Sequence, residues 1–401
     1  MHGGRLSALD ASFFAAESSA PHGDGHVLLT GATGFLGMEL LARYLERTDR
    51  TVVALVRAPD RHQARARIGG VMRLLFGERS AHRERVVAIP GDVRRDRLGL
   101  AQRDLELVAG SVSEIVHCAA TVSFAAGLPE SRRINVEGTS QVLGLAERCT
   151  RHGVLRRLVH VSTAYVSGTC EGEFGEGDLS VGQRFRNPYE RSKYEAEELV
   201  REHVDELPAV TIVRPSIIVG ESTTGWTPSF NVLYVPLRGF VQRKMRVLPA
   251  DLSAPVDVVP VDHVADAIIH LTRQREPGLG TYHLVAGERA STVAQLVELS
   301  ARHVRRRPPP IVSPAVYRAV YPLLRACAGQ RRRAALKRVQ PFLPYYTMRV
   351  RYRRDRAVEK LDPAGLSPPP LESYYHRLLG WAIQSNWSKR PLPRAQAATS
   401  R

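Results

Sequence analysis

The sequence predicts an α/β protein with a doubly wound parallel sheet, a smaller lobe after it and a basic helical extension toward the C-terminus. Two observations predict the sheet. Apolar runs of strand length alternate with helical patterns through the first 215 residues, and a glycine-rich turn joins the first run to the first helix. The chain has 401 residues, of which 43% are hydrophobic, so it is long enough to bury a sizeable core.

The glycine-rich turn lies between an apolar run at 26–30 and a helical pattern at 38–46. Gly31 permits a tight turn, Gly34 lets the backbone approach a pyrophosphate, and Gly37 allows close packing of helix on strand. The N-terminus of the helix favours the anion. This Rossmann-type pattern predicts that a dinucleotide contacts Thr30, Gly31, Thr33, Gly34, Phe35, Leu36 and Gly37.

The second apolar run, at 51–56, ends in Arg57. An acid at this position would accept a hydrogen bond from the ribose 2′-hydroxyl, whereas an arginine can pair with a 2′-phosphate. Arg57 therefore favours NADP(H) over NAD(H) as the cofactor. The alternative is an ordinary surface arginine, since the chain contains 52 arginines and only five lysines.

Two further runs, at 85–89 and 114–117, extend the predicted sheet. After the first, Asp92 is placed to accept from an adenine amine, and Val93 is placed to donate its backbone N–H. After the second, Ala119 and Ala120 form a loop of small residues beside which a cofactor can lie. Ligands of such sheets bind at the carboxyl ends of the strands.

A fifth run, at 158–161, leads directly into Ser162 and Thr163. A hydroxyl at the carboxyl end of this strand faces the cofactor side of the sheet. The sequence therefore predicts that one of these two side chains binds the substrate oxygen.

A helix is predicted from Pro188, with Asn187 as its N-cap. Tyr189 and Lys193 then lie four residues apart on one helical face. A tyrosine has a pKa of about 10, and a neighbouring ammonium is expected to lower it toward neutrality, so the pair suits acid–base chemistry. Lys193 can also reach the nicotinamide ribose. A surface pair of no function is the alternative.

Together these motifs resemble the extended short-chain dehydrogenase/reductases. Over residues 25–290 the likeness is greatest to the fatty acyl-CoA reductase and thioester reductase branch, with its male sterility type NAD(P)-binding domain. The motifs that carry it are Thr30 to Gly37, His117 to Phe124, Asn135 to Thr139, Val161 to Tyr165, Tyr189 to Lys193 and Val213 to Ser216.

The resemblance implies a catalytic triad of Thr163, Tyr189 and Lys193, with Ser162 as the fallback for the first hydroxyl. It also implies a supporting role for Asn135. Pro215 and Ser216 are implied to border the nicotinamide. The implied activity is NADPH-dependent reduction of a fatty acyl thioester, carried on CoA or a carrier protein, to an aldehyde or alcohol.

Two other activities fit the same scaffold. One is a hydroxysteroid dehydrogenase or a nucleotide-sugar epimerase or dehydratase. The other is a non-enzymatic, cofactor-sensing scaffold held on a membrane or nucleic acid. The non-enzymatic alternative is disfavoured, because a protein that only senses a cofactor does not need Tyr189 and Lys193.

Four segments are expected: an N-terminal tail (1–25), an NADP-binding domain (26–215), a substrate-binding lobe (216–304) and a basic extension (305–401). Residues 301–401 contain 22 Lys and Arg but four Asp and Glu, whereas the first 300 residues contain 35 and 36. Basic residues mixed with aromatic and aliphatic ones suit an anionic membrane surface. Nucleic acid is less expected, because no motif typical of nucleic-acid binding accompanies the charge. A solvated basic surface is the remaining alternative.

The apolar residues at 230–240 can line an acyl channel, although core packing is the commoner role of such a run. Four cysteines without CxxC spacing indicate no metal site or disulfide framework and favour a reducing cytoplasm. No apolar run of membrane-spanning length is present in the sequence, so a soluble or membrane-peripheral protein is expected. The oligomeric state is left open.

Overall fold

The computed structural model describes residues 25–78, 80–124, 126–230, 233–274, 276–327, 329–330, 333, 340–387 and 390–398. Nearly all of the predicted N-terminal tail and most of the basic cluster at 331–339 lie outside these residues. Seven parallel strands form the central sheet, in the order β12-β7-β5-β4-β1-β2-β3, which confirms the predicted fold class. They are β1 (His26–Thr30), β2 (Val52–Val56), β3 (Val86–Pro90), β4 (Val112–His117), β5 (Arg157–Val161), β7 (Ala209–Pro215) and β12 (Gly278–Leu284).

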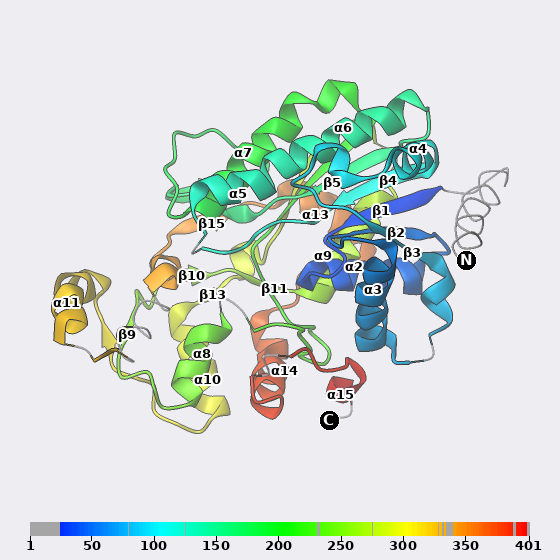
Figure 1. Ribbon diagram of the computed structural model, residues 1–401. Helices are drawn as coiled ribbons and strands as arrows, with labels where there is room; N and C mark the ends of the chain where they lie inside the picture. Colours follow the sequence, from blue (N-terminus) through cyan, green and yellow to red (C-terminus); the bar gives the residue numbers. More distant parts are fainter. Residues whose placement is uncertain are drawn as a thin grey trace.

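Helices cover both faces of the sheet because alternate strand residues point to opposite sides and both sides are apolar. In β1, Val27 and Leu29 pack on one side and Leu28 packs on the other. The first side carries α2 (Phe35–Arg47), α3 (Arg61–Phe76) and α9 (Val261–Thr272). The second carries α4 (Gln102–Ser111), α5 (Leu128–Asn135), α6 (Glu137–Arg151) and α7 (Pro188–Glu202), seen along the top of Figure 1.

The strand order reverses between β1 and β4, which are neighbours in the sheet. In open α/β sheets the ligand crevice lies at this point, outside the carboxyl ends of the strands. The glycine-rich turn after β1 and the loop after β4 therefore meet where the sequence predicts the cofactor.

A second lobe is built around its own apolar cluster. Its helices are α8 (Tyr234–Val241), α10 (Val293–His303) and α14 (Leu371–Gln384). Short strand pairs connect it to the sheet domain: β8 (Ile217–Val219) with β11 (Val258–Pro260), β9 (Leu248–Pro249) with β14 (Ile311–Val312), and β10 (Pro255–Val256) with β13 (Ser291–Thr292). The remaining short elements are η1 (Ala81–Arg85), η2 (Asp96–Gly99), η3 (Ala164–Ser167), η4 (Val204–Glu206), η5 (Gly287–Arg289), η6 (Gln340–Tyr346) and η7 (Asp362–Ala364).

The chain beyond residue 305 packs back onto both lobes. β15 (Val350–Tyr352) pairs with β6 (Gly172–Phe174), and α13 (Asp355–Leu361) contributes Ala357 and Leu361 to the core of the sheet domain. α14 supplies much of the second lobe's core. The basic extension is therefore part of the folded body. The extension also contains α11 (Pro314–Cys327) and α15 (Ala395–Ala398). Among the described residues, no helix is long and apolar enough to span a bilayer.

Close to the C-terminus, Arg394 reaches a group of buried acids. Its guanidinium lies 2.5 Å from Glu221 and 3.6 Å from Glu39, and its backbone N–H donates to the Leu74 carbonyl. Burial raises the pKa of Glu39 to about 7, although Arg43 and Arg394 oppose this shift. The neighbouring arginines thus offset only part of the cost of burying these carboxylates.

Replacing Glu39 by glutamine is expected to flatten the pH dependence of stability. Because the pKa of Glu39 is raised, the folded protein binds more protons than the unfolded chain between about pH 4.5 and pH 7, so its stability falls as the pH rises through this window. Between pH 5 and pH 8, the free energy of unfolding should fall by up to about 3 kcal/mol less in the glutamine variant than in the wild type. Urea unfolding at the two pH values measures this difference. Parallel pH profiles would contradict this expectation. Glu46→Gln, on the same helix but more exposed, is the control.

Candidate active site

The glycine-rich turn has the geometry that dinucleotide binding requires. Gly31 has φ of +76°, and a Cβ there would lie 2.8 Å from the Ala119 nitrogen. A Cβ on Gly37 would lie 2.0 Å from the Gly31 carbonyl oxygen. α2 begins after Gly34, which is exposed, and no side chain of the described residues caps this end. The free N–H groups of the first helical turn can therefore receive a pyrophosphate.

Replacing Gly37 by alanine is expected to weaken binding of the dinucleotide at least tenfold. The added methyl must displace the backbone of the turn, since the nearest atoms are the carbonyl group of Gly31. Isothermal titration with NADPH measures the change. Gly144→Ala in α6 is the control, because nothing lies within 4 Å of its Cβ position, and it should bind NADPH normally.

Thr30 lies at the crevice, but its side chain is engaged within the protein. Its hydroxyl accepts from the backbone N–H groups of Cys118 and Ala119 and bonds Nδ1 of His117 at 2.8 Å. Burial, and then the Lys193 ammonium, lowers the pKa of His117 to about 3, so this ring is neutral. The Thr30 side chain thus holds the loop after β4 in place. The predicted contact between Thr30 and the cofactor stays a prediction, and it would have to come from the main chain of this residue.

Arg57 is exposed at the end of β2, near Asp92. The Asp92 carboxylate accepts from Nε and Nη2 of Arg94 at 3.0 and 2.6 Å. These contacts lower the pKa of Asp92. Arg94 therefore lies with Arg57 beside Asp92, which the sequence analysis missed because a local Asp-x-Arg pair carries no motif. The adenine contact predicted for Asp92 stays a prediction. The side chain of Val93 packs where α6 begins, at Gly138.

The structure brings Thr163 and Tyr189 together. Asn187 caps α7 by accepting from the Glu190 N–H at 3.0 Å, and Pro188 is the first residue of the helix. Burial raises the pKa of Tyr189 to about 12, and a hydrogen bond with Thr163 opposes part of the shift. The expected lowering of this pKa is therefore wrong.

Lys193 explains the difference, because its ammonium is engaged elsewhere. Its Nζ donates to the Val161 carbonyl at 2.7 Å and lies 3.4 Å from Nε2 of His160. Burial lowers the pKa of Lys193 to about 8. A Tyr189 with a raised pKa stays protonated at neutral pH, which is the state needed to donate a proton.

Ser162, the fallback hydroxyl, is committed to a different partner. Its Oγ donates to Glu197 at 2.6 Å, and Glu197 forms a fully buried ion pair with Arg214 at 2.6 Å. Arg214 also donates to the carbonyl oxygens of Gly175 and Asp178. The Thr163 hydroxyl instead donates to the Pro215 carbonyl at 3.4 Å, so only Thr163 faces Tyr189. A charged residue near the carboxyl end of an otherwise apolar strand is the signal that identifies Arg214.

Asn135, at the end of α5, links the loop after β4 to α7. Its side chain accepts from the Thr121 N–H at 2.8 Å and donates to the Thr121 carbonyl and to Ser192. Ser192 precedes Lys193, so this amide positions the helix that carries Tyr189. Ser216, after Pro215, is buried and donates its N–H to the Leu284 carbonyl.

Tyr345, from the C-terminal extension, also reaches this site. Its hydroxyl accepts from the Asn187 side chain and donates to buried Glu190, both at 2.7 Å. Its ring stacks on Phe124 with centroids 5.3 Å apart, and Phe124 lies 5.8 Å from the ring of Tyr189. No local pattern reveals this contact, because Tyr345 lies 155 residues beyond Glu190 in the chain.

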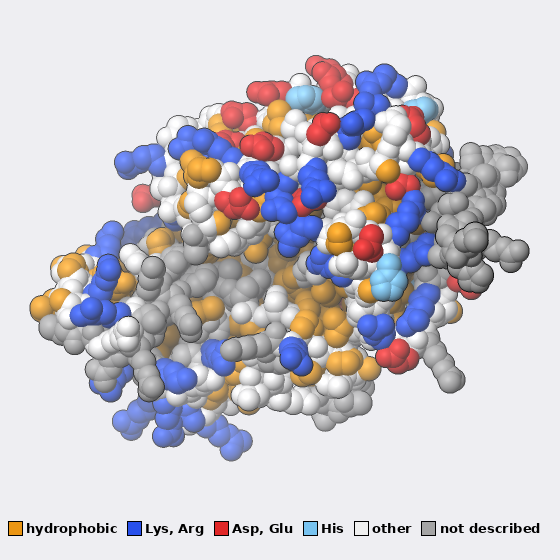
Figure 2. Space-filling model, viewed as in Figure 1, with side chains coloured by type: hydrophobic (Ala, Val, Ile, Leu, Met, Phe, Trp, Pro, Cys, Tyr) orange, Lys and Arg blue, Asp and Glu red, His pale blue; other side chains and the backbone are white. Residues whose placement is uncertain are grey.

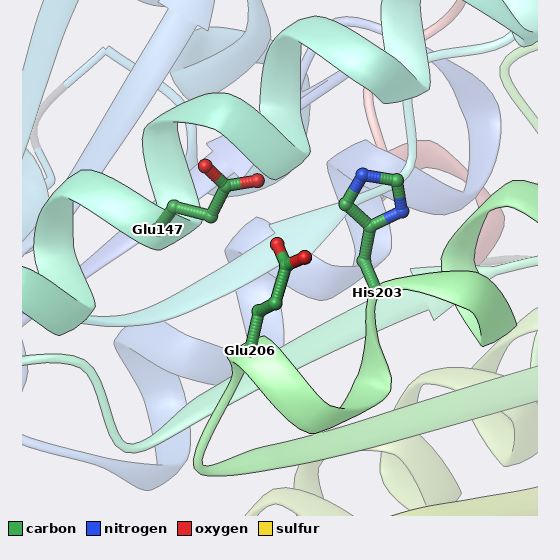
Figure 3. Close-up of side chains that lie close together, drawn as sticks. All are labelled: Glu147, His203 and Glu206. Carbon is green, nitrogen blue, oxygen red and sulfur yellow. The ribbon is translucent and has the colours of Figure 1, made fainter.

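Three potential metal ligands, Glu147, His203 and Glu206, gather where α6 and η4 approach each other (Figure 3). Their ligand atoms lie within 4.8 Å of one another, and Glu206 is exposed. Nδ1 of His203 already bonds the Leu199 carbonyl at 2.9 Å. Exposed acidic groups are common on protein surfaces, so this arrangement does not alter the expectation from the sequence that the site uses no metal.

The parallel sheet, the dinucleotide turn and the Thr163–Tyr189 pair define the class of the protein. It is an NAD(P)-dependent oxidoreductase with the extended short-chain dehydrogenase/reductase fold. Residues 29–268 match the model of the male sterility protein family. The chain belongs to this family, which confirms the resemblance found in the sequence.

Curated relatives and solved structures agree with this family assignment. The chain is 34% identical over 285 residues to an isonitrile lipopeptide synthase of Streptomyces coeruleorubidus, covering 70% of this chain and 19% of that protein. It is 26% identical over 355 residues to fatty acyl-CoA reductase 1 of Arabidopsis thaliana, covering 71% and 72%. The crystal structure of the terminal R domain from the myxalamid PKS-NRPS pathway superposes with a TM-score of 0.79 at 25% identity, covering 95% of this chain and all of that one. The chain thus spans about a fifth of the length of the first relative.

Proposed function

We propose that the protein reduces a fatty acyl thioester, carried on CoA or a carrier protein, with NADPH. The observation that carries this proposal is the protonated Tyr189 hydroxyl, hydrogen-bonded to Thr163, at the crevice of a dinucleotide-binding sheet. Fatty acyl-CoA reductase 1 of Arabidopsis thaliana is among the relatives, and this supports a thioester as substrate.

Each side chain has a defined task in this proposal. A bound nicotinamide dinucleotide supplies the hydride. Tyr189 donates a hydrogen bond to the carbonyl oxygen as negative charge develops on it, and the Thr163 hydroxyl turns from the Pro215 carbonyl to donate to the same oxygen. Tyr189 then supplies the proton, which gives a hemithioacetal. Its carbon–sulfur bond breaks to release the aldehyde and the free thiol, and a second hydride and proton convert the aldehyde to an alcohol. Lys193 holds a positive charge beside the cofactor's expected ribose position, and Asn135 keeps α7 in register with the loop that borders the site.

The activity is tested by incubating the purified protein with NADPH and palmitoyl-CoA, following loss of NADPH absorbance, and identifying the product by mass spectrometry. The proposal expects an aldehyde or alcohol. Turnover of a sterol or a nucleotide sugar, without turnover of any acyl thioester, would overturn it in favour of the other activities of this scaffold.

The preference for NADPH rests on Arg57 and its neighbour Arg94. Replacing Arg57 by aspartate is expected to lower the ratio of kcat/KM for NADPH to that for NADH at least tenfold, because a carboxylate repels the 2′-phosphate and accepts from a 2′-hydroxyl. Steady-state kinetics with both cofactors measure this ratio. Arg83→Asp, the same charge change at an exposed site in η1, should leave it unaltered.

We also propose that the extension meets an anionic membrane surface. Residues 301–354 contain 15 Lys and Arg and no Asp or Glu. α11 exposes Val316, Val320 and Leu323 at helical spacing. Figure 2 shows basic side chains gathered at this end of the molecule. Apolar and basic groups together suit the interface of an anionic bilayer.

The membrane contact is tested by sedimentation with vesicles. Binding to vesicles that contain phosphatidylserine, but not to pure phosphatidylcholine, supports it, as does weaker binding by Leu323→Glu. Val358→Glu, at an exposed position of α13, is the control. Equal sedimentation of Leu323→Glu and wild type, or binding to DNA without binding to vesicles, would overturn it.

A further inference from the structure

A row of polar side chains crosses the carboxyl end of the apolar sheet, on the face that α6 and α7 cover. Thr30 of β1 pairs with His117 of β4, and His117 pairs with His160 of β5. These three side chains are buried and point to the same face, since they occupy matching positions of neighbouring parallel strands. Lys193, from α7, places its ammonium 3.4 Å from Nε2 of His160. The row therefore ends at the lysine of the candidate site.

The first histidine of the row, His117, has both ring nitrogens bonded within the protein. The Thr139 hydroxyl donates to the Asn135 carbonyl at 2.6 Å, so its oxygen accepts from Nε2 of His117, which lies 3.1 Å away. Nδ1 of His117 then accepts from the Thr30 hydroxyl at 2.8 Å. No ring nitrogen of His117 is left for His160, and the two rings pack with centroids 5.6 Å apart.

The second histidine, His160, is bonded on one side alone. Among the described residues its Nδ1 has no hydrogen-bond partner, and its Nε2 lies against the Lys193 ammonium. Burial, and then the charge of Lys193, lowers the pKa of His160 well below its usual value, so the ring is neutral and carries one proton. Because the ammonium donates, this proton lies on Nδ1 and Nε2 accepts.

Packing alone does not account for an imidazole at this position of β5. A buried N–H without a partner costs stability, and here the Nδ1–H of His160 is such a group. Leu158, two residues earlier on the same face of the strand, belongs to the apolar cluster under the helices. An apolar side chain at 160 would avoid the cost of the unpartnered N–H. The contact with Lys193 is the feature that explains the histidine.

The Lys193 ammonium needs acceptors because it is buried. Its two near partners are the Val161 carbonyl, at 2.7 Å, and His160. Burial lowers the pKa of Lys193 to about 8, although Glu197 of α7 and Cys118 of the loop after β4 favour the charged state. Loss of a hydrogen-bond acceptor is therefore expected to bring the loss of the proton closer to neutral pH.

We propose that His160 is a positioning residue for Lys193: Nε2 of its uncharged ring accepts from the ammonium and keeps this charge at the carboxyl end of β5. The consequence for catalysis rests on the proposed function, in which the charge lies beside the expected ribose position of the cofactor. The contact itself can be tested without any substrate.

The titration of Lys193 tests the proposal. The chain contains only five lysines, so lysine labelled with ¹³C at Cε gives a simple NMR spectrum, in which Lys193→Arg identifies the signal. His160→Leu removes the acceptor and should lower the midpoint by about one pH unit or more, the effect of losing one hydrogen bond to a charged group. His160→Gln, whose side-chain oxygen can accept in place of Nε2, should restore most of the difference. An unmoved midpoint in His160→Leu would overturn the proposal.

His263→Leu is the matched control. His263 is a buried histidine of α9, which covers the other face of the sheet, so its loss should leave the titration of Lys193 unchanged. His160→Phe replaces His160→Leu if the latter does not fold, because phenylalanine keeps a ring beside His117 and has no acceptor. Equal shifts in His263→Leu and His160→Leu would show that any change in the core moves the lysine, and would overturn the proposal.

Kinetics separate this inference from the proposed function. In His160→Leu, the alkaline limit of kcat for palmitoyl-CoA should move down by the same interval as the Lys193 midpoint, and His160→Gln should restore it. A lowered midpoint, without reduction of a thioester by the wild type, supports the positioning role and removes only the proposed function. Reduction of thioesters with the same Lys193 midpoint in His160→Leu and the wild type would overturn the positioning role and leave the function standing.

Discussion

Replacing Tyr189 by phenylalanine is expected to lower kcat for thioester reduction by about 10²- to 10⁴-fold, the usual contribution of a positioned proton donor. The phenol is the group that donates to the substrate oxygen, and its pKa of about 12 keeps it protonated at neutral pH. The ring remains, so its packing on Phe124 and the fold should be preserved. Steady-state kinetics and NADPH titration measure the two effects, with cofactor affinity expected to change little.

Tyr194→Phe is the matched control for this variant. Tyr194 lies on the same helix, is half-buried, and bonds Ser180 and Glu198 away from the crevice. Its loss should leave kcat within about twofold of the wild type. Full reductase activity of Tyr189→Phe would remove the residue from catalysis, whereas an intact cellular function in a variant that reduces no thioester would favour the non-enzymatic, cofactor-sensing scaffold.

Replacing Arg214 by leucine is expected to cost about 3–5 kcal/mol of the free energy of unfolding, because the buried Glu197 carboxylate loses its fully buried ionic partner and keeps the partly exposed Arg201. Burial alone raises the pKa of Glu197, but the Arg214 guanidinium outweighs this and holds the pKa below its usual value. Without Arg214 the acid must therefore become protonated or the core must open. Urea unfolding at neutral pH measures the loss.

Two companion variants test this explanation. Arg201→Leu removes a partly exposed partner of the same carboxylate and should cost about 1 kcal/mol or less. Replacing Glu197 and Arg214 together by leucine should cost less than Arg214→Leu alone, since no unpaired charge is then buried. Equal losses in Arg201→Leu and Arg214→Leu would show that the buried pair has no special role.

The fold could be predicted because its main signals are local. Apolar runs separated by helical patterns identify the strands and imply parallel order. The glycine spacing requires backbone conformations and close contacts that the structure contains at Gly31 and Gly37. The second lobe was predicted only in outline, because its short strands pair over long sequence separations.

The candidate site could be predicted only where its residues lie close together in the chain. The spacing of Tyr189 and Lys193 follows from one helix, and the cap at Asn187 follows from local hydrogen bonding. The direction in which the Lys193 ammonium points does not, because it depends on the carbonyl of β5 and on a buried histidine. The pKa of Tyr189 was therefore predicted in the wrong direction.

The sequence by itself determined the parallel sheet, the dinucleotide turn, the family and the helix that carries Tyr189. Only the tertiary structure decided which hydroxyl faces Tyr189, which arginine neutralises Glu197, and that Tyr345 packs beside the site. It also turned the basic extension from an appended segment into part of the fold, with Arg394 on the buried acids. The physical reason is range: backbone conformation and helix spacing depend on neighbours in the chain. Burial, ion pairing and pKa depend on residues brought together from far apart.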